Sequence, residues 1–338
     1  MCLSVLLVAL VVVVAPRYLL DWDAPSTPAA DRAKAINDIR ATLLQGLAGV
    51  ALLVGAFFTW RQLQVTRQGQ ITERFTAAVE RLGSASMEVR IGSIYAMERI
   101  AYDSLDERAT IAEVLCAFVK RTALASPPAA RPSPRDTAHK GELARSHAGE
   151  VPLPVRAPDV QAAMSVLGRR ARPRQDQELH LDRADLRGLR LSYADLADAD
   201  LHYADLTDAV LIGADLERAD LTGIWLAGAV LIKANLDQAD LRNVVLWHAR
   251  LDDADLRATD LSGADLTGAV VGGARFDLSD LRGTDFTSVN LAAATFTGAV
   301  ADATTVWPAD FDVAASGVLP TYGAPPLRPQ TYLRPPPA

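Results

Sequence analysis

Residues 191–210 read LSYADLADADLHYADLTDAV, in which a leucine returns every five residues and a small residue stands two places before it. With the frame set on Leu181, the pattern holds without insertion to Phe296, for 24 repeats. The central leucine is replaced only by Val271, Phe276, Phe286 and Phe296. A period of five matches neither the 3.6-residue turn of a helix nor the two-residue alternation of a strand. It predicts a chain that turns at every fifth residue.

Four such turns close a square coil whose interior takes the central leucine and the small residue, while the other three positions face water. We therefore expect a mainly-β, quadrilateral β-helix of about six coils over residues 179–303. A 20-residue coil predicts that each outer face repeats every 20 residues. One face carries His180, Asp200, Asp220, Asp240, Asp260 and Asp280, and the face two sides away carries Arg190, Val210, Val230, Arg250, Val270 and Asn290. The faces differ in chemistry, as a four-sided stack requires.

The N-terminal part of the chain holds two apolar segments. Residues 41–60 contain Gln45 as their single strongly polar side chain, and as a helix they would span ~30 Å, the thickness of a bilayer core. Trp60 and Arg61 follow as interfacial residues. Residues 1–20 predict a first transmembrane helix, with a cleaved signal peptide as the alternative. That alternative lacks the usual basic N-terminal region and a small-residue cleavage site. We expect a multi-pass protein of the cytoplasmic membrane with its β-helix in the cytoplasm.

Between the membrane and the repeats the spacing of apolar residues turns helical. Residues 61–122 predict a small juxtamembrane bundle of three short helices, the first of which is stopped by Gly83 and Ser84. Residues 123–158 are rich in proline and predict a flexible linker. A short helix is expected over 159–171, with Asp159 as its N-cap. Residues 304–338 are expected to form a C-terminal cap and a proline-rich tail.

The charge of the chain argues against nucleic-acid binding. The net charge is −7, and residues 181–300 hold 19 Asp and one Glu against nine Arg and one Lys. Affinity for phosphates rests on Lys and Arg, so direct nucleic-acid binding is not expected. The five histidines are not spaced as metal ligands or placed beside a nucleophile, and there is no phosphate-binding glycine loop. The sequence therefore predicts no enzyme, no catalytic or metal residues and no cofactor.

The repeats resemble the pentapeptide repeat family, whose pattern A-[DN]-L-x-x is met at 194–196, 204–206, 234–236 and 264–266. The resemblance implies a right-handed β-helix, and it implies little about activity. Stretches at 69–75, 88–92 and 95–100 look like the membrane-anchored pentapeptide proteins of actinobacteria. Residues Trp307 to Phe311 look like the C-terminal cap of those proteins.

Two surfaces are candidates for binding. The first is an acidic column, made of Asp200, Asp220, Asp240, Asp260 and Asp280. In the gyrase-protecting branch of the family such a rod resembles duplex DNA and occupies a topoisomerase, which is the alternative function; the simpler reading is that aspartates cap the turns. The second is an apolar patch, made of Val210, Ile212, Trp225, Val230, Ile232, Val245 and Trp247. Clustered outward apolar residues predict a cover, either the 160–170 helix or the proline-rich tail, or else a protein partner or a second copy of the chain.

These features together predict a membrane-tethered, non-enzymatic scaffold. The N-terminal helices would bind the lipid bilayer, and the β-helix would bind a protein partner whose identity the sequence does not reveal.

Overall fold

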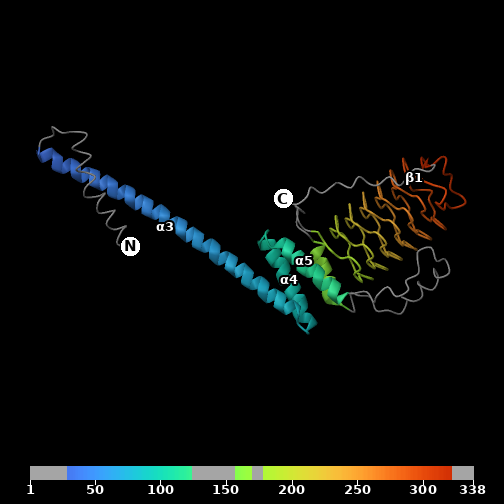
Figure 1. Ribbon diagram of the computed structural model, residues 1–338, viewed down its shortest axis with the longest axis horizontal. Helices are drawn as coiled ribbons and strands as arrows, with labels where there is room; N and C mark the ends of the chain where they lie inside the picture. The colour runs from blue at the N-terminus through green and yellow to red at the C-terminus, as the bar shows by residue number, and fades with distance from the viewer. Residues whose placement is uncertain (1–28, 124–156, 170–177, 322–338) are drawn as a thin grey trace. The chain divides into compact units, whose positions relative to one another are not determined.

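The computed structural model describes residues 29–123, 157–169 and 178–321 (Figure 1). The predicted first span at 1–20, nearly all of the predicted linker at 123–158 and the tail beyond residue 321 lie outside the described residues. The chain divides into two compact units, residues 1–73 and 74–338, and each is considered by itself.

The described part of the first unit is helical. Helix α3 runs from Ala29 to Leu82, and its residues up to Glu73 belong to this unit. No proline interrupts it, so the predicted span at 41–60 and the first predicted juxtamembrane helix form one continuous helix. Between Lys34 and Leu82 it is long and apolar enough to cross a membrane, judged by length and composition. No other such helix occurs within residues 29–123, 157–169 and 178–321.

The second unit begins with the last turns of α3, followed by three shorter helices. These are α4 (Met87–Asp103), α5 (Arg108–Thr122) and α8 (Pro158–Leu167), and α8 packs against both of the others. Ser86 caps α4, because its hydroxyl accepts a hydrogen bond from the Val89 amide at 3.4 Å. The interior between the helices is apolar, and it is filled by the fully buried side chains of Ile94, Met97, Leu115 and Met164.

The prediction that Asp159 is the N-cap of the last helix is wrong. Helix α8 begins one residue earlier, with Pro158 in its first turn and Ala157 at the cap. Asp159 is instead buried and accepts a hydrogen bond from Arg90 Nε of α4 at 2.7 Å. Proline suits the first turn because its missing N–H has no partner to lose there. The acidic side chain therefore joins two helices, and Arg90 is not simply a solvated surface residue.

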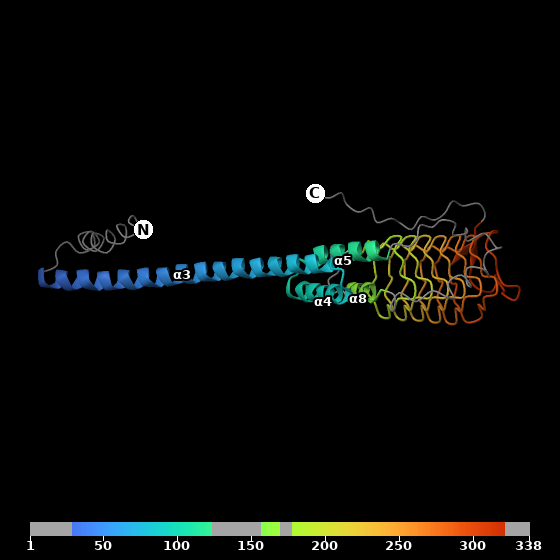
Figure 2. The ribbon, with the colours of Figure 1, turned by 90° about the horizontal axis from the view of Figure 1, so that it is seen from below.

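Residues 178–306 form the stacked coils of a β-helix (Figure 1, Figure 2). From His180 to Asp280, parallel bridges pair the residue before each central position with the residue 20 positions later, with Val270 and Asn290 as the exception. Both backbone groups of the bridge take part: the Leu201 amide donates to Asp220 O, and the Asp220 amide donates to Ala199 O, each at 2.9 Å. A 20-residue period made of five-residue repeats gives four sides to each coil, as the sequence predicted.

The repeats turn because one position, two residues after the central residue, adopts the left-handed conformation. Apart from Ala293, the non-glycine residues at this position have φ between 53° and 62°. In the turn that follows Leu201, the Ala204 amide donates to Leu201 O at 3.0 Å while Tyr203 holds a φ of 57°. Glycine, asparagine and aspartate tolerate this conformation best, and they are frequent here. The left-handed position thus sets the corner of the coil.

The interior is a ladder of central side chains that ends in aromatic rings. The central leucines are almost fully buried, and removal of one such side chain typically costs ~2–5 kcal/mol. Toward the C-terminus Phe276 and Phe296 stack with ring centroids 5.1 Å apart, and Trp307 stacks on Phe286 at 5.1 Å and on Phe311 at 5.1 Å. These rings fill the open end of the coil.

The repeat register changes at the same end of the β-helix. Asp285 pairs with Val306, which is 21 rather than 20 residues later, so one extra residue enters after the last repeat. The short strand β1 (Val300–Ala301) then pairs in parallel with β2 (Leu319–Pro320). This strand covers part of the last coil's exposed backbone edge, which would otherwise be open to pairing with another chain.

Helices α5 and α8 bind the opposite end of the β-helix. The Asp185 amide donates to Ala123 O at 2.6 Å, and the Asp195 amide donates to Gly168 O at 2.8 Å. Lys120 of α5 also pairs with Asp182. Burial alone would raise the pKa of Asp182, but the hydrogen bond and the charge of Lys120 together lower it. The helical part therefore supplies hydrogen-bond partners to the first coil, where no preceding coil is available.

Candidate interaction surfaces of the β-helix

The five aspartates of the acidic column lie in one line. Consecutive coils pair Asp200 with Asp220, and the same parallel pairing continues through Asp240 and Asp260 to Asp280. Stacked strands lie ~4.8 Å apart, so the carboxylates recur at about that spacing. The structure brings together every residue that the sequence assigned to this column.

The column is less open than the sequence analysis supposed. Asp220 is exposed and Asp200 and Asp240 are half-buried, but the side chains of Asp260 and Asp280 are only 8% and 9% accessible. Burial raises the pKa of Asp260, and the neighbouring charges of Asp280 and Asp240 act in the same direction. The accessible acidic surface is therefore concentrated in the first three members.

Each carboxylate of the column also closes its own turn. Oδ1 accepts a hydrogen bond from the amide two residues later, for example from Thr222 to Asp220 at 3.0 Å and from Ser262 to Asp260 at 2.9 Å. This Asx-type bond replaces a backbone partner that the turn would otherwise lack. The contacts thus agree with the simpler reading, in which aspartate recurs because it stabilises the turn.

Two arginines neutralise part of the column. Arg242 Nη2 lies 2.6 Å from Asp240 Oδ2, its Nε lies 3.9 Å from Asp260 Oδ2, and Arg282 pairs with Asp280. The hydrogen bond from Arg242 to Asp240, helped by the surrounding carboxylates, raises the pKa of the arginine. These two arginines therefore reduce the negative charge that Asp240, Asp260 and Asp280 present.

The apolar patch divides into an accessible part and a buried part. Val210 pairs with Val230, and these two side chains lie half-buried, as do Ile212, Ile232 and Trp225. Val245 and Trp247 are only 1% and 5% exposed. The expectation that all outward positions face water is therefore wrong for these two residues. The rings of Trp225 and Trp247 meet edge to face, with centroids 5.9 Å apart.

The side that carries Trp225 and Val245 is buried along most of its length. Asp185, Asp205 and Asp265 occupy the same outward position on this side, and each is less than 5% exposed. Arg187 bridges two of them, at 2.7 Å from Asp185 Oδ2 and 3.7 Å from Asp205 Oδ2. The sequence does not predict this burial, because the residues of this side share no chemical type and the repeat pattern alone places them in water.

The hydrogen bonds between helix α8 and the β-helix do not involve residues of the apolar patch. Gln161 donates to Arg190 O and accepts from the Arg190 amide, both at 2.9 Å, and Gly168 accepts from Asp195. These partners belong to the first coil, one coil before Val210. The helix therefore meets the end of the stack.

These features define the class of protein: a β-helix of stacked 20-residue coils, closed by helices at one end and by aromatic rings at the other. The family model of pentapeptide repeats matches in eight copies, at residues 180–218, 211–247, 219–257 and 259–298. The chain belongs to the pentapeptide repeat family, whose members fold as right-handed β-helices.

Several solved pentapeptide repeat structures are similar to the chain. HetL, a protein from Nostoc involved in heterocyst differentiation regulation, is 32% identical over 37% of this chain and 69% of its own, with a TM-score of 0.30. A protein of the thylakoid lumen of Arabidopsis thaliana is 33% identical over 31% of this chain and 70% of its own, with a TM-score of 0.22. QnrB1, a plasmid-mediated fluoroquinolone resistance protein, is 24% identical over 43% of this chain and 75% of its own, with a TM-score of 0.38. No curated protein sequence matches the chain significantly.

Proposed function

We propose that the protein is a membrane-tethered, non-enzymatic scaffold that binds a protein partner through the side of its β-helix. The single observation that carries this proposal is the combination of a hydrogen-bonded stack of coils with a helix whose apolar side chains at residues 41–60 are mostly exposed. No catalytic family is indicated by the comparisons, and pentapeptide repeat proteins are generally interaction modules. A stack in which each coil bonds to its neighbours offers a surface of constant shape.

The tether is argued from the side chains of α3. Leu52 and Leu53 are 76% and 74% exposed, which is costly in water and favourable in a bilayer. The hydroxyl of Thr59 donates to Gly55 O at 2.9 Å, so this polar group is satisfied within the helix, as a lipid environment demands. Trp60 stands at the end of the apolar segment, where aromatic residues favour the membrane interface. The proposal includes a multi-pass arrangement with residues 1–20 as a first span and a cytoplasmic β-helix.

Membrane extraction tests the tether. The full chain should remain in the membrane pellet after washing with alkaline carbonate, whereas Leu52→Arg together with Leu53→Arg should release it. Each arginine near the centre of a span costs ~2.5–3.5 kcal/mol on insertion scales. Leu105→Arg is a matched control, since Leu105 is also exposed but lies outside the span. Release of the unmodified chain by carbonate would refute the tether.

The partner surface is assigned to the accessible part of the apolar patch, Val210, Ile212, Trp225, Val230 and Ile232. Arg190 and Arg250 flank it in the same column, so a partner with an apolar segment and an acidic edge fits this side. Crosslinking from membranes followed by mass spectrometry, repeated with Ile212→Ser and Ile232→Ser, tests the assignment. A partner captured equally by the variant and the unmodified chain would remove this surface from consideration.

The alternative, binding to a topoisomerase through the acidic column, is less well supported. The column presents little accessible negative charge. Asp260 and Asp280 are buried, and Arg242 and Arg282 pair with Asp240 and Asp280. Salt-sensitive inhibition of a topoisomerase by the full chain, lost on substituting Asp200 and Asp220 by asparagine, would favour this alternative over the scaffold.

A further inference from the structure

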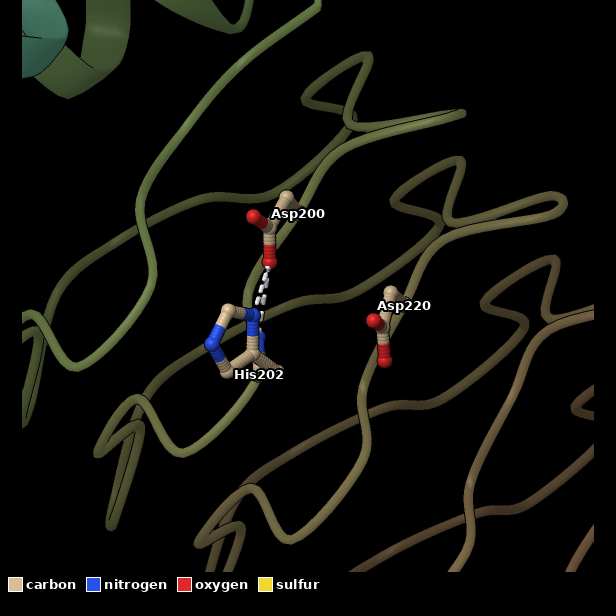
Figure 3. Close-up of side chains that lie close together, drawn as sticks. All are labelled: Asp200, His202 and Asp220. Carbon is tan, nitrogen blue, oxygen red and sulfur yellow. Dashed lines mark hydrogen bonds and ion pairs between the residues drawn. The ribbon is translucent and has the colours of Figure 1, made fainter.

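Ligating side chains from successive coils meet near the start of the acidic column. One donor atom each from Asp200, His202 and Asp220 lies within 4.8 Å of the others (Figure 3). His202 Nδ1 lies 2.5 Å from Asp200 Oδ1. The histidine follows Asp200 by two positions, and Asp220 is the bridge partner of Asp200 in the next coil. The 20-residue period therefore assembles a group that no local sequence motif announces.

A fourth donor stands on the preceding coil. His180 is the bridge partner of Asp200 on its other side, and its Nδ1 lies 3.8 Å from Asp200 Oδ2. The His180 side chain is 53% exposed and the side chains of Asp200 and His202 are about one-third exposed, so an ion from solvent can reach all of them. Three successive coils thus offer two imidazoles and two carboxylates in one line.

The corresponding place in later coils is occupied by a cation from the chain itself. Arg242 follows Asp240 by two positions and contacts both Asp240 and Asp260, just as His202 stands beside Asp200 and Asp220. Two carboxylates ~4.8 Å apart repel one another by several tenths to a few kcal/mol, depending on the local dielectric. A positive charge between them removes this repulsion. In the pair Asp200 and Asp220 an imidazole takes the place of the guanidinium, and imidazole nitrogen is a metal ligand whereas guanidinium is not.

We propose that Asp200, His202 and Asp220 bind a divalent transition-metal ion such as Zn²⁺, with water completing its coordination. Imidazole with carboxylate is a common donor set for this class of ion. Ligand atoms at ~2.0–2.2 Å from one ion lie about 3–3.5 Å apart, so the three side chains must draw together by rotation about their own bonds. The ion takes the place of the contact between His202 Nδ1 and Asp200 Oδ1, and the neutral imidazole then carries its proton on Nε2.

The consequence for the protein is a crosslink between coils. The ion would join the coils of Asp200 and Asp220 through side chains, in addition to the backbone bonds, near the end of the stack that receives α5 and α8. Ligand binding to the folded state alone raises its stability in proportion to the logarithm of the ion concentration over Kd. This inference does not depend on the proposed scaffold function.

Isothermal titration calorimetry of the full chain in detergent with Zn²⁺ tests the site. We expect one ion per chain bound through this group, and Co²⁺ should give visible absorption bands of a site with nitrogen and oxygen ligands. His202→Asn and Asp220→Asn should each weaken binding by at least ~100-fold, since even partners of metal ligands typically contribute 10–100-fold. Asp220→Asn keeps an oxygen acceptor for the Thr222 amide, so the turn is preserved. Far-UV circular dichroism verifies the fold of each variant.

His248→Asn is the matched control, because His248 is an exposed histidine at another corner of the β-helix. It should bind Zn²⁺ as the unmodified chain does. The proposal is overturned if the unmodified chain binds no Zn²⁺ at millimolar concentration, or if His202→Asn binds it equally well. In the first case His202 acts only as a hydrogen-bond partner of Asp200, and in the second an adventitious ion binds elsewhere.

Discussion

Leu278 occupies the left-handed position of its turn with a φ of 62°, and 69% of its surface is exposed. An L-residue with a side chain loses ~1–2 kcal/mol in this conformation, because its Cβ approaches the following carbonyl oxygen. Glycine avoids that contact but loses ~0.5–1 kcal/mol more conformational entropy on folding. The exposed leucine contributes little packing that would be lost. Leu278→Gly should therefore stabilise the β-helix by ~0.5–1 kcal/mol.

The reverse substitution supplies the matched comparison. Gly223 holds the same turn position with a φ of 63°, and a Cβ there would lie 2.4 Å from Tyr203 Cε1. Gly223→Ala should destabilise the β-helix by ~1 kcal/mol, since the left-handed conformation costs more than the alanine saves in entropy and the Tyr203 ring must also move. The pair thus predicts opposite signs for two changes at equivalent corners.

Urea unfolding of the full chain in detergent, followed by far-UV circular dichroism, measures both effects. The midpoint should rise for Leu278→Gly and fall for Gly223→Ala with the slope unchanged, which indicates a change of stability rather than of the unfolded state. If Leu278→Gly lowers the midpoint, as glycine does inside an ordinary strand, the left-handed turn is not what shapes the repeat. The same conclusion would follow if Gly223→Ala were neutral.

Three further predictions concern the ends of the stack and one buried carboxylate. Phe296→Ala should lower stability by ~3–5 kcal/mol in the same urea assay, because the ring is buried and stacks on Phe276. Gly168→Ala should cost ~1–3 kcal/mol, since a Cβ there would lie 2.8 Å from Ala194 Cβ and force α8 off the first coil; a neutral result would contradict this close approach. Asp260→Asn should raise the thermal midpoint of unfolding at pH 7. Burial raises the pKa of Asp260 in the folded state, so the protonated carboxyl stabilises the fold below the unfolded-state pKa. That stabilisation is lost as the pH rises through the folded-state pKa. The advantage of the asparagine should shrink as the pH falls below 4, and an advantage independent of pH would contradict burial of a charged carboxylate.

The five-residue repeat predicts much of the β-helix from the sequence alone. The predicted 20-residue period appears in the structure as parallel bridges, and the five predicted aspartates form one column. Both results rest on local chemistry, because each five-residue repeat carries its own turn and its own buried side chain. Once the coil length is known, the stacking order of the faces follows from counting.

The repeat does not predict which outward side chains are accessible to solvent, as Val245 and Trp247 show. The repeat pattern puts them on the outside of the coil, yet they are nearly inaccessible to solvent. The bond between Asp159 and Arg90 is likewise beyond the sequence pattern, because it joins residues that lie far apart in the chain. Burial of an outward side chain depends on what packs against it, and a five-residue period contains no information on that.

The sequence by itself therefore determined the β-helix, its four sides and the chemical type of each column, because turns and core positions recur within every repeat. Only the tertiary structure decided which parts of those columns are accessible and which donors meet. Asp200, His202 and Asp220 come together because a coil of 20 residues returns the chain to the same side one strand spacing further on. Such a meeting depends on distances between coils, and these exist only after the chain has stacked.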